Sequence, residues 1–324
     1  MNIRAGRYAL RAWVGSSILV SLLLGLVSCD VSPGGRMEDE ARAKVLVDTA
    51  WVAQHHGDAA VRLLDLGRSH AQYAAGHIPD ARYINWLSDI TAPENPEMYL
   101  ILSRERYEAL MSRLGISPES TVVIYDDKSS RLSARMFWTM RYYGHQDLRI
   151  LDGGIGAWTR SGRSLVAALP EVVPSDYRVS LVNSDYLAEQ AYIEIHLGEP
   201  GFALVDGRPT PQYTGSEVGT VFHTGTAHQR LGHIYSAHNV PWALNFNEDG
   251  TFKSTAELRA LYVPHEITED KIVITYCNEG LHASPPWFVL KELLAYPDVR
   301  LYDASLAQWA NQPDTMMVQG KLCM

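Results

Sequence analysis

The chain has 324 residues, of which 46% are hydrophobic and 20% are charged, and its formal net charge at pH 7 is −9. This composition is that of an ordinary globular protein and excludes a disordered or fibrous chain, while the length allows one large domain or two domains of typical size. The acidic balance argues against nucleic acid as a partner, because phosphate backbones select basic surfaces.

The first 29 residues have the layout of a secretory signal. Three arginines among the first eleven residues form a cationic start, and an uncharged run follows over residues 12–28. The ending Leu26-Val27-Ser28-Cys29 resembles a bacterial lipobox, which implies lipidation of Cys29 and anchoring to a bacterial membrane on the periplasmic side. The alternative is an N-terminal membrane helix, which would also leave the rest of the chain outside the cytoplasm. Residues 30–40 are polar, as in a tether.

A repeat of about 150 residues organises the rest of the chain. Three motifs recur in the same order at a nearly constant offset. The pairs are Gly76-His77-Ile78 with Gly232-His233-Ile234, Val123-Ile124-Tyr125-Asp126 with Ile274-Thr275-Tyr276-Cys277, and Asp152–Trp158 with Asp303–Trp309. We therefore expect two copies of one domain, over residues 41–166 and 181–318, joined by a proline-containing linker at 167–180.

Each copy alternates short apolar strands with helical segments. Strands are predicted at 61–66, 121–125 and 149–151 in the first copy, and at 202–206, 271–276 and 299–302 in the second. The helices after the two central strands are predicted at 134–143 and 286–294, and a capping box of Ser254 and Glu257 begins another. This alternation predicts an α/β fold in which each domain is a mainly parallel sheet with helices on both faces. Ligands bind such sheets at the carboxyl ends of the strands.

Residues that both copies share are candidates for structure, and residues that only one copy has are candidates for function. His77 and His233 lie in the same turn, so each is predicted to make a structural hydrogen bond. Arg68 and Arg208 both follow a strand-ending acid, which favours a structural role for them too, although Arg208 is also a candidate to face the site.

The two copies differ after the central strand. The first reads Asp126-Asp127-Lys128-Ser129-Ser130-Arg131, and the second reads Cys277-Asn278-Glu279-Gly280-Leu281-His282. Only the second copy places a thiol at the end of a strand and before a helix, where loop amides and the helix N-terminus favour the thiolate. Gly280 allows the loop to curl back. Cys277 is therefore predicted to be a nucleophile, and the alternative is an inert buried cysteine.

Together these motifs resemble the two-domain rhodaneses, the thiosulfate and 3-mercaptopyruvate sulfurtransferases, over about residues 41–318. In that family only the second domain carries the catalytic cysteine and the first has an acid in its place, as Cys277 and Asp126 do here. The resemblance implies that Cys277 takes sulfane sulfur from a small donor and passes it to cyanide, a thiol or a protein thiol, without a cofactor. The substrate-binding residues that it implies are Arg208 and the loop amides of Asn278, Glu279, Gly280, Leu281 and His282.

The loop departs from the family in its charge. Thiosulfate-type members carry cations in the two places after the cysteine and mercaptopyruvate-type members carry small residues, whereas this chain has Asn278 and Glu279. Gln212 stands where many members have a second arginine. A pocket-facing Glu279 would repel an anionic donor and raise the pKa of the thiol, and a protonated His282 would partly offset this. The loop thus favours a less charged, bulkier or protein-bound sulfur donor.

Other chemistries fit the sequence less well. Phosphatases and arsenate reductases with such a loop need Cys-x5-Arg to grip the oxyanion, and Ala283 occupies that position. The segment 214–229 has no counterpart in the first copy; His223, His228, His233 and His238 recur there and beyond at intervals of five, a step that keeps no face of a helix or strand, so no metal is expected. Two alternatives to a sulfurtransferase stay open: a non-catalytic lipoprotein that binds a partner or senses oxidation, and a persulfide carrier with an unusual donor.

Overall fold

The computed structural model describes residue 1 and residues 40–67, 69–92, 98–127 and 129–320. The signal segment with Cys29, nearly all of the tether and Arg68 lie outside these ranges, so the structure does not test what the sequence predicts for them. Within the described ranges, no helix has the length and apolar character needed to cross a membrane.

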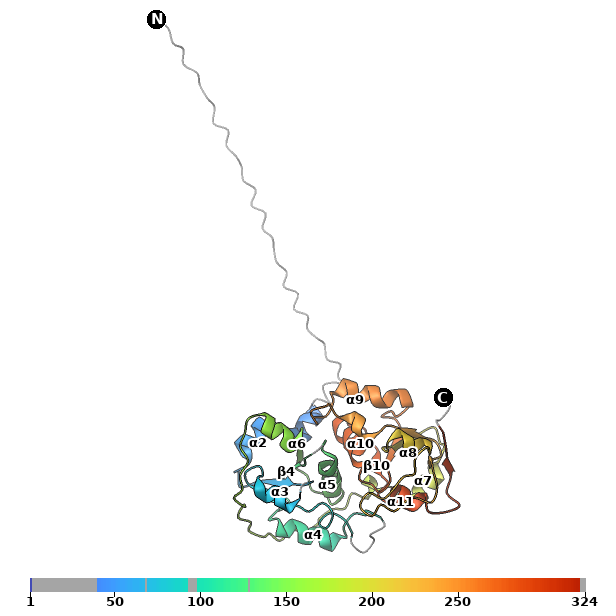
Figure 1. Ribbon diagram of the computed structural model, residues 1–324, viewed down its shortest axis with the longest axis horizontal. Helices are drawn as coiled ribbons and strands as arrows, with labels where there is room; N and C mark the ends of the chain where they lie inside the picture. Colours follow the sequence, from blue (N-terminus) through green and yellow to red (C-terminus); the bar gives the residue numbers. More distant parts are fainter. Residues whose placement is uncertain (2–39, 68, 93–97, 128, 321–324) are drawn as a thin grey trace.

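The N-terminal domain, which is coloured blue to green in Figure 1, is built on a sheet of five parallel strands in the order β1-β5-β4-β2-β3. The strands are β1 (Leu46–Val47), β2 (Val61–Asp65), β3 (Ala81–Tyr83), β4 (Thr121–Tyr125) and β5 (Leu148–Leu151). The helices are α2 (Thr49–His55), α3 (His70–Ala75), α4 (Arg104–Arg113), α5 (Arg131–Tyr142) and α6 (Gly154–Arg160). The central strand β4 is apolar and buried almost throughout, as expected of a parallel strand that helices cover on both faces.

The C-terminal domain repeats this plan with four parallel strands in the order β10-β9-β6-β8. These are β6 (Phe202–Asp206), β8 (Ala237–Asn239), β9 (Ile272–Tyr276) and β10 (Val299–Leu301), and a separate antiparallel pair joins β7 (His233–Ile234) to β11 (Met317–Val318). The helices are α7 (Gln190–His196), α8 (Thr210–Thr214), α9 (Thr255–Tyr262), α10 (Ser284–Phe288) and α11 (Ser305–Trp309). The α/β class and the two parallel sheets are confirmed.

Two helices begin earlier than the sequence predicts. Helix α5 starts at Arg131 and not near residue 134, because the Asp126 carboxylate accepts hydrogen bonds from the first backbone N–H groups of the helix. Helix α10 starts at Ser284 with two prolines in its first turn, where their missing N–H groups are not needed, and it continues as a π-helical turn over residues 289–293. The capping box of Ser254 and Glu257 is confirmed at the start of α9.

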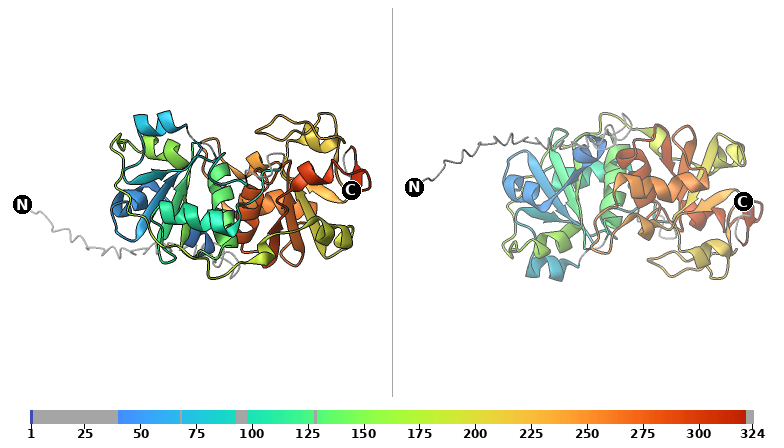
Figure 2. Two further views of the ribbon diagram at one scale, coloured as in Figure 1. Left: turned by 90° about the horizontal axis from the view of Figure 1, so that it is seen from below. Right: turned by 90° about the horizontal axis from the view of Figure 1, so that it is seen from above.

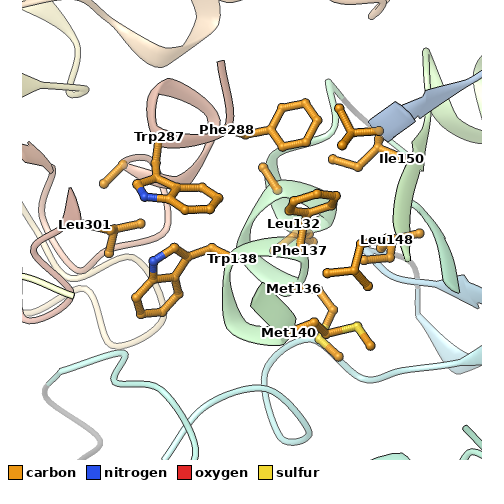
Figure 3. Packing of buried hydrophobic residues seen from close by; sticks show 14 of the residues in the cluster. Leu132, Met136, Phe137, Trp138, Met140, Leu148, Ile150, Trp287, Phe288 and Leu301 are labelled. Atoms are coloured by element: carbon orange, nitrogen blue, oxygen red, sulfur yellow. The ribbon is translucent and has the colours of Figure 1, made fainter. Parts of the chain in front are cut away.

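Helices α5 and α10 join the two domains. The rings of Phe137 and Phe288 meet edge to face at 4.9 Å, and Trp138 and Trp287 lie fully buried beside them (Figure 3). All four belong to one hydrophobic cluster that takes residues from both domains. Figure 2 shows the two halves side by side, with the green α5 against the orange α10 at the junction. The carboxyl ends of the central strands β4 and β9 therefore lie close to this shared core.

Candidate active site

Cys277 follows directly on β9, at the carboxyl end of the sheet, and its side chain is buried with 1% of its surface exposed. The Oγ of Ser305 accepts hydrogen bonds from the backbone N–H groups of Cys277 and Gly280, both at 3.1 Å, and donates to the carbonyl of Tyr302. One serine thus holds both sides of the loop turn. Gly280 has the positive φ of 81° that the tight turn requires, and a Cβ there would lie 2.6 Å from Asp303.

The thiol is surrounded by backbone donors, yet its pKa is raised. Burial raises the pKa of Cys277 to about 11, and the charge of Glu279 acts in the same direction. The N–H groups of Glu279, His282 and Ala283 point to the sulfur and lower its pKa, with Glu279 N at 3.4 Å from Sγ, but they do not outweigh burial. The loop amides therefore favour the thiolate, as the sequence predicts, but burial outweighs them and the pKa of Cys277 is raised overall.

The Glu279 carboxylate binds the segment 214–229. It accepts hydrogen bonds from the backbone N–H of Phe222 at 3.0 Å and from the Nδ1 of His223 at 3.2 Å. The side chain is only 2% exposed, and burial raises its pKa. Glu279 thus attaches the segment to the loop of residues 277–282, while its charge still disfavours the thiolate.

Asn278 is the second attachment point of the same segment. Its Oδ1 lies 3.1 Å from the Nε2 of His228, and its amide donates to Gln212. Burial lowers the pKa of His228 to about 4, so its ring is neutral. A Cβ at Gly219 would lie only 2.6 Å from Asn278, so a residue without a side chain is needed where the segment crosses the loop. We call residues 214–229 the cover segment.

His282 does not supply the positive charge that the sequence suggested. Its ring stacks on Trp242 with centroids 5.1 Å apart, and burial, with the Arg131 charge beside it, lowers its pKa to about 3. The Nε2 of His282 accepts a hydrogen bond from Nη1 of Arg131 at 3.0 Å. The cation at this point of the site therefore comes from the N-terminal domain. Leu281 is buried in the shared core and contributes packing.

Arg208 lies beside the loop as half of a buried ion pair. Its Nε and Nη2 donate to the Asp206 carboxylate at 2.6–3.1 Å, and Nη2 also donates to the carbonyl of Gly232. The negative charge of Asp206 therefore offsets most of the attraction that Arg208 would offer to an anion.

The histidines of the shared turns have structural partners. The Nδ1–H of His77 donates to the carbonyl of Tyr73, and the imidazole of His77 stacks on the ring of Tyr73. In the second domain, His233 makes the same two contacts with Tyr213. His238 lies apart from the loop, near His265. In the part of the chain that the structure describes, no three His, Cys, Asp or Glu side chains gather closely enough to hold a metal.

Sequence reasoning missed Ser305, Arg131 and the cover-segment contacts. Ser305 was detectable: it matches Gly154 in the first copy, and both adopt a positive φ, of 48° and 55°. Because a non-glycine residue at positive φ is strained, the serine indicates a role for its hydroxyl. Arg131 and the contacts of Phe222 gave no such signal, since they depend on how the domains dock.

Comparison with known proteins agrees with this architecture. A family model described as Rhodanese-like domain matches residues 48–161 and 189–312. The sulfur carrier protein TtuD of Thermus thermophilus is 39% identical over 87% of this chain and 99% of its own length. A putative thiosulfate sulfurtransferase of Haloferax volcanii is 35% identical over 82% and 93%. SseA of Escherichia coli, a 3-mercaptopyruvate sulfotransferase by its description, superposes with a TM-score of 0.71 at 25% identity, covering 80% of this chain and 98% of that one.

Proposed function

The chain belongs to the rhodanese family and is a sulfurtransferase, and we propose that Cys277 carries the transferred sulfur as a persulfide. The observation that carries this proposal is the position of Cys277 at the end of β9, with three backbone N–H groups directed at its sulfur. Donors in that arrangement stabilise an anion without any movement during the reaction. They would serve the outer sulfur of a persulfide as well as the thiolate.

The reaction has two displacements. In the first, the Cys277 thiolate attacks the transferable sulfur of the donor; a sulfur–sulfur bond forms, and the bond to the rest of the donor breaks. Thiosulfate would leave as sulfite, and 3-mercaptopyruvate would leave as the enolate of pyruvate, which takes up a proton. In the second, cyanide, a thiol or a protein thiol attacks the outer sulfur and the thiolate departs. The proton of the resting thiol must be lost first, because the pKa of Cys277 is about 11 in the closed site.

Intact-mass spectrometry tests this directly. The purified chain is incubated with thiosulfate or with 3-mercaptopyruvate, and a gain of one sulfur atom is expected in the native chain and not in Cys277→Ser. A gain that persists in Cys277→Ser, or no gain with either donor at a cysteine that alkylates readily, would contradict the proposal that Cys277 accepts sulfur from small donors.

A persulfide carrier that receives sulfur from a protein is a second candidate, favoured by the cover segment. Cys277 is only 1% exposed, the cover segment binds the two residues that follow it, and the relative from Thermus thermophilus is named a sulfur carrier. The rate of sulfur transfer from free thiosulfate distinguishes the two candidate functions. A carrier would be slow with free thiosulfate and would return its sulfur readily to a protein thiol, whereas an enzyme for small donors turns over with either acceptor.

For the location of the protein, we propose a lipid anchor at Cys29 on the periplasmic side of a bacterial membrane. The support is the Leu-Val-Ser-Cys ending after an uncharged run. A palmitate analogue fed to expressing bacteria should label the native chain and leave Cys29→Ala unlabelled. Recovery of the native chain as an unlabelled protein in the soluble fraction would contradict the anchor.

A further inference from the structure

Among the residues that the structure describes, three arginines lie around the loop that carries Cys277, and two of them are paired with carboxylates. Arg208 pairs with Asp206, and Arg135 pairs with Asp303 in a buried contact. Arg131 differs from both. Among the described residues it has no carboxylate partner, and its one recorded hydrogen bond there is to the neutral ring of His282.

Arg131 is nevertheless held in a defined place. Its guanidinium lies over the ring of Phe222, 5.4 Å from the centroid, and over the ring of Trp242, 5.6 Å from the centroid. Such contacts with aromatic faces fix the plane of the group and leave N–H donors available at its edge. The side chain is half-buried, so its charge is less screened than that of an exposed arginine.

The same contacts place Arg131 at the thiol loop. His282, whose ring accepts from Arg131, also directs its backbone N–H at the sulfur of Cys277. Phe222, whose ring lies under the guanidinium, gives its backbone N–H to Glu279. On the His282 side, one residue separates the Arg131 guanidinium from the sulfur of Cys277, and on the other side Phe222 and Glu279 separate them.

We propose that Arg131 binds the oxyanion group of the sulfur donor, a carboxylate or a sulfonate-type group, while the donor's sulfur meets Cys277. The proposal rests on the sulfurtransferase function and assigns the binding of the donor's anionic group to a residue of the N-terminal domain. It revises the sequence-based preference for a less charged, bulkier or protein-bound donor, because the N-terminal domain places a cation beside the loop that the loop itself lacks. Arg131 is therefore a specificity-determining residue from the domain without the cysteine.

A pair of alkylating agents tests the proposal without any sulfur transfer. Iodoacetate and iodoacetamide react with the same thiol and differ in charge, so the ratio of their rates at Cys277 reports attraction of an anion. In Arg131→Met, which keeps a long unbranched side chain between the two rings, the iodoacetate rate relative to iodoacetamide should fall about tenfold. Arg131→Lys should keep part of the ratio.

The matched control is Arg178→Gln, which makes the same change in net charge at a residue whose side chain is 65% exposed in the linker. It should leave the ratio within about twofold, because exposed charges at a distance are screened. An equal fall in both variants would mean that net charge alone acts, and an unchanged ratio in Arg131→Met would overturn the proposal.

If Cys277 reacts too slowly with the alkylating agents, isothermal titration calorimetry measures anion binding directly. Thiosulfate is titrated into Cys277→Ser and into the double variant with Arg131→Met, and the affinity should fall about tenfold in the second. Equal affinities would overturn the anion site. Because neither experiment needs turnover, a protein that binds anions through Arg131 but gains no sulfur would refute the proposed function and leave this site standing.

Discussion

At the scale of single residues, opposing effects on one sulfur decide the chemistry. Three N–H groups favour the Cys277 thiolate, while burial and the Glu279 carboxylate oppose it, and the balance leaves the pKa at about 11. At neutral pH the closed site therefore holds a thiol. Rhodanese chemistry needs the thiolate, so the reaction has to begin with the loss of that proton.

Glu279→Gln should lower the pKa of Cys277. The amide removes the negative charge beside the sulfur while its oxygen still accepts from Phe222, so the thiolate is less disfavoured and the thiolate fraction at neutral pH rises. We expect a fall of about one pKa unit, and hence a rise of about tenfold in the iodoacetamide rate at pH 7. In the native chain that rate should grow about tenfold per pH unit until the pH approaches the pKa.

The exposed Glu189→Gln serves as the control for charge and should not move the profile. A pKa of Cys277 that stays the same or rises in Glu279→Gln would show that the carboxylate does not repel the thiolate across the loop.

At the scale of elements, the internal repeat predicted the strands of the two sheets but not the contacts of the cover segment. Strands such as β4 and β9 were predictable because a buried parallel strand must be apolar, and both copies carry the same signal. The cover segment has no counterpart in the first copy. Its contacts with the loop join residues fifty or more positions apart, such as Phe222 with Glu279, and no local pattern encodes them. For the same reason, the sequence predicted that the charge of Glu279 raises the pKa of the thiol, but it did not predict that Glu279 binds Phe222 and His223.

His223→Ala should loosen the cover segment. The variant removes one of two hydrogen bonds that Glu279 makes to the segment and leaves that buried carboxylate with less compensation. Amide hydrogen exchange over residues 219–228 should become faster, and iodoacetamide should reach Cys277 several-fold faster. His196→Ala removes a comparable histidine–carboxylate contact, with Glu199, at the surface of α7 and should change neither. Unchanged exchange in His223→Ala would mean that the segment is held by other contacts.

At the scale of the whole molecule, the two domains act as one unit. Their cores merge where α5 meets α10, and the site takes Cys277 from one domain and Arg131 from the other. The first copy, which has no thiol, thus contributes in two ways. Its Asp126 caps the start of α5, which packs on α10 of the C-terminal domain, and α5 also carries Arg131. The sequence predicted two domains but not this division of roles, because docking is decided by the shapes of both surfaces together.

The buried pair of Arg135 and Asp303 provides a test of this unity. Arg135→Met leaves the Asp303 carboxylate buried with the backbone N–H of Ile101 as its remaining partner, so the free energy of unfolding should fall by about 3–5 kcal/mol. Because the pair joins the domains, hydrogen exchange should accelerate in both sheets together. Removing the exposed pairing of Arg178 with Asp176 by Arg178→Met should cost less than about 1 kcal/mol.

The double variant Arg135→Met with Asp303→Asn completes the cycle. If the loss comes from an uncompensated buried charge, neutralising Asp303 should recover a large part of it, since a buried pair replaced as a whole is often close to neutral in free energy. Denaturant unfolding of the native chain, of each single variant and of the double variant measures the coupling between Arg135 and Asp303. Losses that simply add, or a loss confined to the N-terminal sheet, would mean that the pair does not bind the domains together, and that the position of Arg131 over the thiol loop depends on apolar packing alone.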